Sequence, residues 1–349
     1  MKKVTAAMSG GVDSSVSAVI LKDMGYEVCG ATLRLYERDG VSAEVAAAKE
    51  VCDRLGIAHK VYDMRSTFKT EVIERFARGY ALGLTPNPCI ECNKYLKFGA
   101  LLDEALKDGC DFIATGHYSD IGFDVGSGRY LLYRPADRKK DQTYVLWRLS
   151  QHQLSHMLMP LSRLTKDEVR EIAEKYAFSS ASAKESQDIC FVPDGDYAAF
   201  LEEYRGEPFK TGDYTDICGK VLGRHLGHQH YTIGQRKGLG IALGKPQFVI
   251  SKDPVTNTVI LGDEEHIYKK RVYINNVNFI GAVSDGRDLT CTARLRYSAR
   301  DEKCVFHPLS ETEALLEFEN PQRGPTPGQS AEFYDGDAVL GGGYIIRSE

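Results

Sequence analysis

The first third of the chain alternates between short apolar runs and longer segments that carry one apolar face. The short runs predict β-strands at residues 2–8, 27–35, 57–64 and 111–118. The longer segments have helical spacing and predict helices at residues 14–24, 42–55, 67–82 and 94–108. Strands separated by helices of this length form a parallel, doubly wound sheet, whose ligands bind at the carboxyl ends of the strands.

Beyond about residue 205 the pattern changes, because glycines and turn residues become frequent and the apolar runs become short. From about residue 270, alternating runs predict antiparallel strands at 271–280, 289–297, 313–319 and 330–336. Such a series is typical of a β-barrel or a sandwich. We therefore predict three domains, at residues 1–205, 206–265 and 266–349.

The composition is that of an ordinary globular protein, since 42% of the 349 residues are hydrophobic and 27% are charged. No run of eighteen apolar residues occurs, which argues against a transmembrane helix, and no signal peptide is visible. We therefore expect a cytoplasmic protein without membrane partners. The net charge of −5 argues against binding nucleic acid through bulk charge, although a local basic surface could still bind one RNA.

The nine cysteines are an odd number at irregular spacing in a chain without an export signal, so a disulfide framework is not expected. Free cysteine is often buried, and Cys29, Cys52 and Cys110 lie in strand or helix patterns that predict core positions. Cys89 and Cys92 differ, because they form a C-x-x-C pair in a segment predicted to be a proline-rich loop.

The strongest local signal is the segment Ser9–Ser15, SGGVDSS, which follows the first predicted strand and precedes the first predicted helix. Glycines allow the backbone to approach a polyanion, and a helix N-terminus offers N–H groups and a positive dipole end. The pattern is neither Walker A nor G-x-G-x-x-G. The alternative is a helix N-cap at Asp13 or Ser14 behind a glycine turn. The strand–loop–helix context favours phosphate binding.

SGGVDSS resembles the signature of the PP-loop ATP pyrophosphatases, which split ATP into AMP and pyrophosphate while they adenylate an oxygen. Further segments are similar to the tRNA-specific 2-thiouridylases, the MnmA family, in the order of that family. They lie at residues 85–98, 114–118, 139–146, 185–191, 231–241 and 327–343. The resemblance implies a PP-loop domain of the adenine nucleotide alpha hydrolase-like class, a small central domain and a C-terminal antiparallel β-barrel that binds tRNA.

The implied reaction is the ATP-dependent 2-thiolation of the wobble uridine in tRNAs for Lys, Glu and Gln. Adenylation of the C2 oxygen precedes sulfur transfer, and the products are 2-thiouridine, AMP and pyrophosphate. Mg²⁺ is expected from the phosphate chemistry. By similarity, ATP would contact Ala7, Met8, Ser9, Gly10, Gly11, Val12, Asp13, Ser14, Leu33 and Gly116.

The resemblance also implies that Cys190 carries a persulfide and that Cys92 is the second catalytic thiol. Cys92 would free sulfide from the persulfide or resolve the spent site as a disulfide with Cys190. Both roles need an accessible, partly ionised thiol, and Lys94 and Lys184 are near enough in sequence to assist. The sulfur donor would be a cysteine desulfurase or a persulfide relay protein.

Cys89 departs from the common family pattern, which has aspartate at this position of the Asn-Pro loop. A thiol has a pKa near 8.5 rather than about 3.9, so it cannot inherit the role of a carboxylate. One hypothesis is that Cys89 is a tolerated variant. The other is that Cys89, Cys92 and Cys190 bind an iron–sulfur cluster that carries sulfide, with zinc a weaker option. The persulfide route is the preferred interpretation.

The wobble uridine must leave its base stack in the tRNA before it can be modified. The resemblance places the tRNA against Asn87, Pro88, Cys89, His117, Lys140, Asp141, Gln142, Arg296, Tyr297 and Gln329. Arg294, Arg296, Tyr297 and Arg300 also predict a basic and aromatic stripe suited to phosphate contact and stacking.

Two other functions compete with thiolation. A PP-loop synthetase for a small metabolite would need neither the cysteines nor the terminal β domain. A tRNA-binding protein without catalysis would not need SGGVDSS, Cys92 and Cys190 together, and all of them are present.

Overall fold

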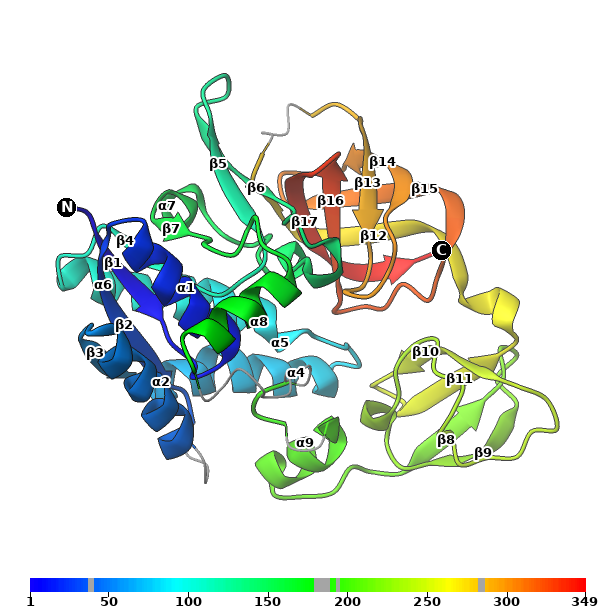
Figure 1. Cartoon of the computed structure of the whole chain (residues 1–349). Helices are drawn as coiled ribbons and strands as arrows, with labels where there is room; N and C mark the ends of the chain where they lie inside the picture. Colours follow the sequence, from blue (N-terminus) through cyan, green and yellow to red (C-terminus); the bar gives the residue numbers. More distant parts are fainter. Residues whose placement is uncertain (37–40, 179–188, 193–194, 282–285) are drawn as a thin grey trace.

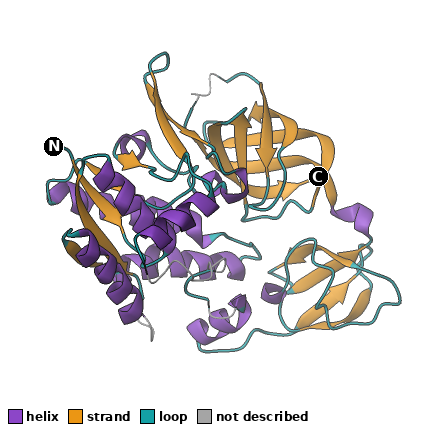
Figure 2. Cartoon of the chain, in the orientation of Figure 1, coloured by secondary structure: helices purple, strands orange, loops and turns teal. Residues whose placement is uncertain are grey.

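The computed structural model describes residues 1–36, 41–178, 189–192, 195–281 and 286–349. Within these residues the strands form three sheets of five, four and eight strands (Figure 1). Helices gather around the five-stranded sheet, whereas the other two sheets carry few of them (Figure 2). No helix in the described ranges is long and apolar enough to cross a membrane.

The N-terminal sheet is parallel throughout and has the order β3-β2-β1-β4-β7. Its strands are β1 (Lys3–Ala7), β2 (Glu27–Arg34), β3 (His59–Asp63), β4 (Phe112–Ala114) and β7 (Met157–Leu158). The flanking helices include α1 (Val12–Asp23), α2 (Val41–Leu55), α7 (Gln151–Ser155) and α8 (Lys166–Lys175). Apolar side chains of β1 pack against α1, α2 and α8 in one buried core. The predicted parallel sheet is confirmed.

A second group of helices contains the C-x-x-C pair, with Cys89 in α5 (Pro88–Glu91) and Cys92 in η2 (Cys92–Ala100). It also comprises α3 (Arg65–Phe68), η1 (Lys69–Glu74), α4 (Arg75–Ala81) and α6 (Leu101–Lys107). Helix runs without a break from Pro88 to Lys107, so the predicted loop around Cys89 and Cys92 is wrong. Asn87 caps this helix by accepting a hydrogen bond from the Cys89 N–H, and proline at the first helical position is a start signal.

The C-terminal strands close into a barrel, because β12 pairs with both β15 and β17. The six strands are β12 (Tyr268–Phe279), β13 (Leu289–Arg294), β14 (Glu302–Pro308), β15 (Glu313–Arg323), β16 (Ser330–Asp335) and β17 (Ala338–Ser348). All neighbouring strands are antiparallel, which confirms the barrel rather than the sandwich.

The barrel is joined to the N-terminal part of the chain. The hairpin of β5 (Asp120–Asp124) and β6 (Arg129–Tyr133) extends the barrel sheet through pairing of β6 with β17. Gly342 in β17 lies so close to the buried Trp147 that a Cβ atom there would be 2.5 Å from the indole ring. The fold therefore fixes the barrel against the domain that carries SGGVDSS.

The central domain has the strand order β10-β11-β8-β9 and its own small core. Its strands are β8 (Gly212–Thr215), β9 (Val221–His225), β10 (Phe248–Asp253) and β11 (Thr258–Gly262). Helix α9 (Tyr197–Arg205) precedes this domain. The described residues also contain four short 3₁₀ helices, which are η3 (Arg138–Lys140), η4 (Thr143–Val145), η7 (His228–His230) and η8 (Glu264–Ile267).

Candidate active site at the carboxyl edge of the parallel sheet

The turn between β1 and α1 is shaped to receive an anion. Gly10 has a φ of +77°, and a Cβ atom there would lie 2.9 Å from the Glu44 carbonyl oxygen, so the position requires glycine. Gly11 is the N-cap residue, and no side chain caps the helix. The alternative of a cap at Asp13 or Ser14 is therefore wrong. The first turn of α1 presents its backbone and the positive end of its dipole to a ligand.

Serine hydroxyls hold this turn in place from the inside. The Ser14 and Ser15 hydroxyls each donate to the Gly11 carbonyl oxygen at 2.9 Å, and Ser9 Oγ lies 3.2 Å from Ser14 Oγ. Eight predicted nucleotide contacts are consecutive residues from the end of β1 to the first turn of α1, namely Ala7, Met8, Ser9, Gly10, Gly11, Val12, Asp13 and Ser14. Leu33, near the end of β2, packs against the cluster that contains Cys92.

Asp13 is held by two buried side chains. Its Oδ1 accepts a hydrogen bond from the Tyr118 hydroxyl at 2.9 Å and from Lys166 Nζ at 2.6 Å. Tyr118 is 2% exposed and Lys166 is 7% exposed. Gly116 approaches the same helix turn, because a Cβ atom there would lie 2.8 Å from the Asp13 carbonyl carbon. The structure thus gives Gly116 a packing reason to be glycine, beside its predicted contact with the nucleotide.

The three candidate thiols lie near one another at this edge. Cys89 and Cys92 belong to the first turns of the helix that starts at Pro88, and Cys92 is buried together with Phe191 and Val192. The carbonyl oxygen of Cys190 accepts a hydrogen bond of 3.0 Å from the Tyr36 hydroxyl, just beyond β2. All nine cysteines are free thiols.

Burial raises the pKa of each candidate thiol above its ordinary value. The pKa rises to about 11 for Cys92 and to about 12 for Cys190, and it also rises for Cys89. Solvent reaches the residues Cys89 and Cys190, but protein surrounds their sulfur atoms closely enough to disfavour the thiolate. Proximity of the thiols to one another raises the pKa of Cys190 further, whereas the Lys97 ammonium opposes the rise at all three.

Lys97 rather than Lys94 is the cation that acts on the thiols. Lys94 packs over the Tyr95 ring at 5.3 Å, and burial lowers its own pKa. Lys184, the other predicted helper, lies outside the described residues.

We expect Lys97→Met to slow alkylation of the candidate thiols by iodoacetamide. Removal of the positive charge raises the thiol pKa values, so the thiolate fraction at a given pH falls and each rate–pH profile moves to higher pH. Alkylation at Cys89 and Cys190 would be followed by mass spectrometry between pH 7 and 10. Lys107→Met is the matched control, because Lys107 is exposed and pairs with Glu104. If the rate–pH profiles of the wild type and Lys97→Met coincide, Lys97 does not influence the ionisation of these thiols.

His117 is neutral in this site. It is 8% exposed, its Nδ1 lies 2.7 Å from Thr115 Oγ1, and burial followed by the nearby Lys97 holds its pKa well below the ordinary value. A neutral imidazole has no charge with which to hold a phosphate.

The other predicted RNA contacts are spread over the N-terminal domain and the barrel. Tyr297 is 48% exposed, whereas the Arg296 guanidinium donates to Ile233 O at 3.1 Å and Thr326 Oγ1 at 2.9 Å. Gln329 donates from Nε2 to the Thr85 carbonyl oxygen at 2.7 Å. The remaining residues of this set are Asn87 and Pro88 at the start of α5, Lys140 at the end of η3, and Asp141 and Gln142 between η3 and η4.

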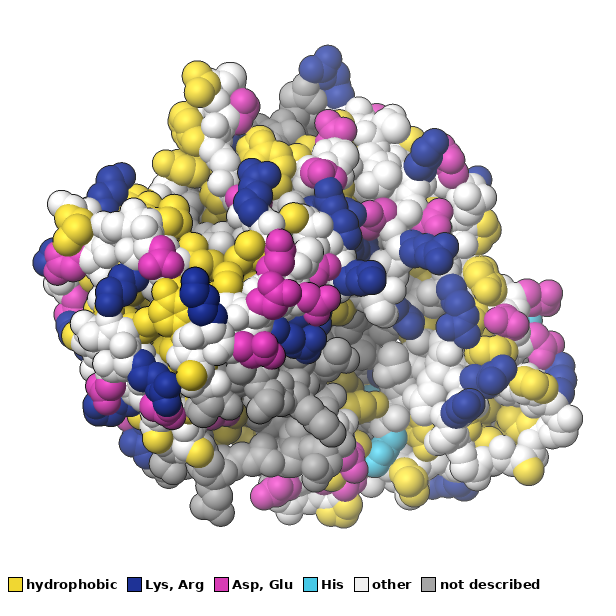
Figure 3. Space-filling view, in the orientation of Figure 1, with side chains coloured by type: hydrophobic (Ala, Val, Ile, Leu, Met, Phe, Trp, Pro, Cys, Tyr) yellow, Lys and Arg dark blue, Asp and Glu magenta, His cyan; other side chains and the backbone are white. Residues whose placement is uncertain are grey.

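Arg294 does not belong to a surface stripe. It is 7% exposed, and its guanidinium binds Asp141 and Asp301. A buried cation committed to two carboxylates cannot contact phosphate, so the predicted role of Arg294 is wrong. On the face drawn in Figure 3, basic and acidic side chains are mixed over the N-terminal domain, and several basic side chains lie over the barrel and the central domain.

The chain is similar to known proteins over almost its whole length. Three family models match consecutive segments: "tRNA methyl transferase HUP domain" at residues 2–194, "tRNA methyl transferase PRC-barrel domain" at 198–263 and "Aminomethyltransferase beta-barrel domain" at 269–345. A tRNA-specific 2-thiouridylase MnmA of Carboxydothermus hydrogenoformans is 46% identical and covers 99% of this chain and 98% of that protein. A second, of Clostridioides difficile, is 44% identical, with 99% of both chains covered.

The chain belongs to the tRNA-specific 2-thiouridylase family. Among solved structures, the U34-tRNA thiolase NcsA from Methanococcus maripaludis with its [4Fe-4S] cluster is 20% identical, with a TM-score of 0.37, over 58% of this chain and 66% of that one.

Three residues of the candidate site were not predicted from the sequence, namely Tyr118, Lys166 and Lys97. Tyr118 directly follows the predicted contacts Gly116 and His117. Lys97 lies five residues beyond Cys92, within the helix predicted at residues 94–108. Lys166 starts a helix far from SGGVDSS in sequence, and no local pattern indicates its contact with Asp13.

Proposed function

We propose that this chain is an ATP-dependent tRNA-uridine 2-sulfurtransferase that replaces the C2 oxygen of the wobble uridine with sulfur. The observation that carries the proposal is the meeting of an anion-binding turn and three thiols at one edge of the sheet. They meet through β2, because Leu33 near its end packs in the cluster that contains Cys92, and the neighbouring strand β1 leads into the turn. Membership of the 2-thiouridylase family supports the same reaction.

The turn between β1 and α1 suits the first step. Oxygen at C2 is a poor leaving group until it attacks the α-phosphate of ATP and pyrophosphate departs, which leaves the uridine adenylated. The N-terminus of α1 would stabilise the phosphates, and the buried Lys166 beside Asp13 adds positive charge nearby. Mg²⁺ bound with ATP would supply further charge to the leaving pyrophosphate. Asp13 is the carboxylate of this turn, and it is already engaged by Tyr118 and Lys166.

The thiols suit the second step. Cys190 is exposed and could receive a persulfide from a donor protein, either a cysteine desulfurase or a relay protein. Because the pKa of Cys92 is raised to about 11, its thiol must lose its proton before it attacks the inner sulfur of the persulfide. The attack would release sulfide and form a Cys92–Cys190 disulfide. The sulfide would then displace AMP from C2 to give 2-thiouridine. Two electrons from an external thiol would reduce the disulfide before the next cycle.

An iron–sulfur cluster does not fit the three cysteines as the structure places them. Cys89, Cys92 and Cys190 are all described, and in the described chain no three His, Cys, Asp or Glu side chains gather closely enough to hold a metal ion. We therefore derive no step through a cluster or through zinc. Cys89 is taken as a variant position beside the base.

The test combines the protein with ATP, Mg²⁺, sodium sulfide and a tRNA transcript of the Lys, Glu or Gln type. We expect AMP, pyrophosphate and 2-thiouridine in equal amounts, measured by nucleoside mass spectrometry and a pyrophosphate assay. A matched transcript with cytidine at the wobble position is the control and should release none of them. Pyrophosphate released equally without tRNA would point to a small-metabolite synthetase, and absence of 2-thiouridine would refute the proposal.

A further inference from the structure

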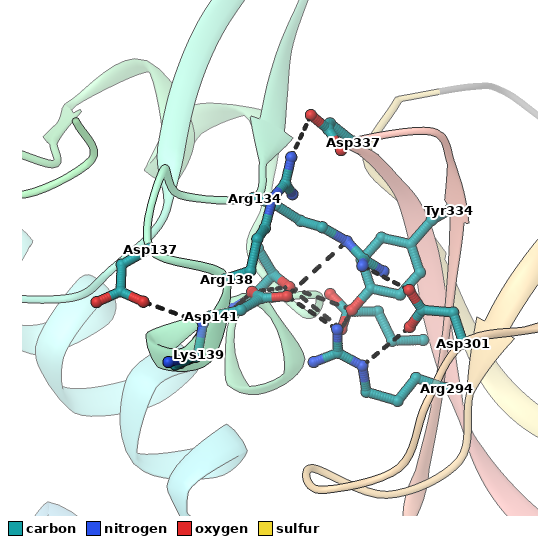
Figure 4. A network of polar contacts seen from close by, with 11 residues as sticks. Arg134, Asp137, Arg138, Lys139, Asp141, Arg294, Asp301, Tyr334 and Asp337 are labelled. Atoms are coloured by element: carbon teal, nitrogen blue, oxygen red, sulfur yellow. Dashed lines mark hydrogen bonds and ion pairs between the residues drawn. The ribbon is translucent and has the colours of Figure 1, made fainter. Parts of the chain in front are cut away.

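A buried network of charges joins the barrel to the N-terminal domain (Figure 4). Arg294 of β13 donates from Nη2 to Asp141 Oδ2 at 2.9 Å and from Nε to Asp301 Oδ1 at 3.1 Å. The Arg134 guanidinium bonds to the same Asp301 carboxylate and lies 3.7 Å from the centre of the Tyr334 ring. Buried charges are costly unless they are paired in good geometry, so this network allows only a narrow range of positions for Asp141.

The segment that follows Asp141 is held just as closely. Asp141 Oδ1 accepts hydrogen bonds from the Thr143 N–H at 3.0 Å and from Thr143 Oγ1 at 2.7 Å. Between these residues, Gln142 pairs twice with the backbone of Tyr118. Gln142 Oε1 accepts from the Tyr118 N–H at 2.9 Å, and the Gln142 N–H donates to the Tyr118 carbonyl oxygen at 3.0 Å. The position of Asp141 therefore sets the position of Tyr118.

Tyr118 completes the connection to the candidate ATP site. Its hydroxyl donates to Asp13 Oδ1 at 2.9 Å, and Gly116, two residues before it, packs against the backbone of Asp13. Asp141 is 5% exposed and Tyr118 is 2% exposed, so water has little access to loosen the connection. A continuous set of contacts thus leads from Arg294 in the barrel to the first turn of α1.

We propose that Arg294 is a positioning residue for the ATP-binding turn and acts through Asp141, Gln142, Tyr118 and Asp13. The proposal rests on the proposed function, because it takes ATP to be the ligand of this turn. The same segment, Lys140–Gln142, is the predicted contact with tRNA. RNA that lies on this segment therefore changes the affinity of the turn for ATP, and ATP changes the affinity for RNA by the same factor.

The test is a double-mutant cycle that measures ATP affinity with Mg²⁺ and without tRNA. We expect Arg294→Met to weaken ATP binding by about tenfold, which is a typical size for energetic coupling between two sites. Arg294→Lys should weaken it less, because lysine keeps the positive charge. Tyr118→Phe removes the hydroxyl that binds Asp13. In that background Arg294→Met should weaken ATP binding less than twofold, because the connection is already cut.

The matched control is Arg271→Met, which removes a barrel arginine whose partner Glu317 is on the surface. It should leave ATP affinity unchanged. A purely structural role for Arg294 predicts a lower Tm with wild-type ATP affinity, or the same loss of affinity with and without the Tyr118 hydroxyl. Either result would overturn the proposal. If Arg294→Met fails to fold, the ATP affinity of Arg294→Lys is compared with and without the Tyr118 hydroxyl instead. Wild-type protein that binds ATP but makes no 2-thiouridine would refute the proposed function alone.

Discussion

Replacement of Cys190 or Cys92 by alanine should abolish 2-thiouridine formation, with a loss of at least about a thousandfold, as for other enzymes that lose an essential nucleophile. In the proposed mechanism each thiol has a separate part, since Cys190 would carry the transferable sulfur and Cys92 would break the persulfide bond. The measurement is nucleoside mass spectrometry after incubation with a persulfide donor. Binding of tRNA should stay within a few-fold of the wild type, because neither thiol supplies charge to the phosphate backbone.

Cys218→Ala is the matched control, because Cys218 is an exposed thiol of the central domain, between β8 and β9. It should retain full activity. Cys89→Asp tests the remaining thiol by placing the common family residue at this position. Retained activity would agree with a variant position, whereas a loss equal to that of Cys92→Ala would assign Cys89 a necessary part. Wild-type activity in either Cys190→Ala or Cys92→Ala would contradict the two-thiol scheme.

Asp13→Ala should block the release of pyrophosphate on addition of tRNA, by about a hundredfold or more, which is a usual loss when a group that organises transition-state charge is removed. The change removes the carboxylate that lies 2.6 Å from the buried Lys166 ammonium and 2.9 Å from the Tyr118 hydroxyl. The first turn of α1 then loses its hydrogen bonds to Lys166 and Tyr118. Pyrophosphate release at saturating tRNA is the measurement.

Asp23→Ala is the control for this change, because Asp23 is the exposed last residue of the same helix. It should leave the release of pyrophosphate unaltered. A lower Tm for Asp13→Ala alone would not account for lost activity, so ATP affinity should be measured below the transition. Unchanged pyrophosphate release in Asp13→Ala would show that Asp13 has no part in adenylation.

The sequence predicted the regular elements of the N-terminal domain because their signals are local. Apolar spacing and glycine stops fix where a strand or helix lies, and α1 and β2 begin and end within a few residues of the prediction. The helix at Pro88 was missed for an equally local reason. Proline breaks helices in their interior but favours their first turn, and Asn87 provides the cap that decides between the two.

The role of Arg294 could not be predicted from its neighbours in sequence. Arginines beside a tyrosine suggested a surface for RNA, yet Arg294 pairs with Asp141, which is 153 residues away along the chain. The β5–β6 hairpin shows the same limit, because nothing within residues 120–133 indicates that β6 will pair with β17. Contacts of this kind depend on how the two domains pack, and no local spacing encodes them.

By itself, the sequence determined the parallel sheet, the terminal β domain, the glycine turn after the first strand and the identity of the candidate thiols, since each depends on residue type and short-range spacing. Only the tertiary structure decided that Lys166 and Tyr118 hold Asp13, that Lys97 is near enough to lower the pKa of the thiols, and that Arg294 of the barrel pairs with Asp141. The physical reason is range. Charges and hydrogen bonds act over a few ångströms of space, and folding alone brings distant residues within that reach.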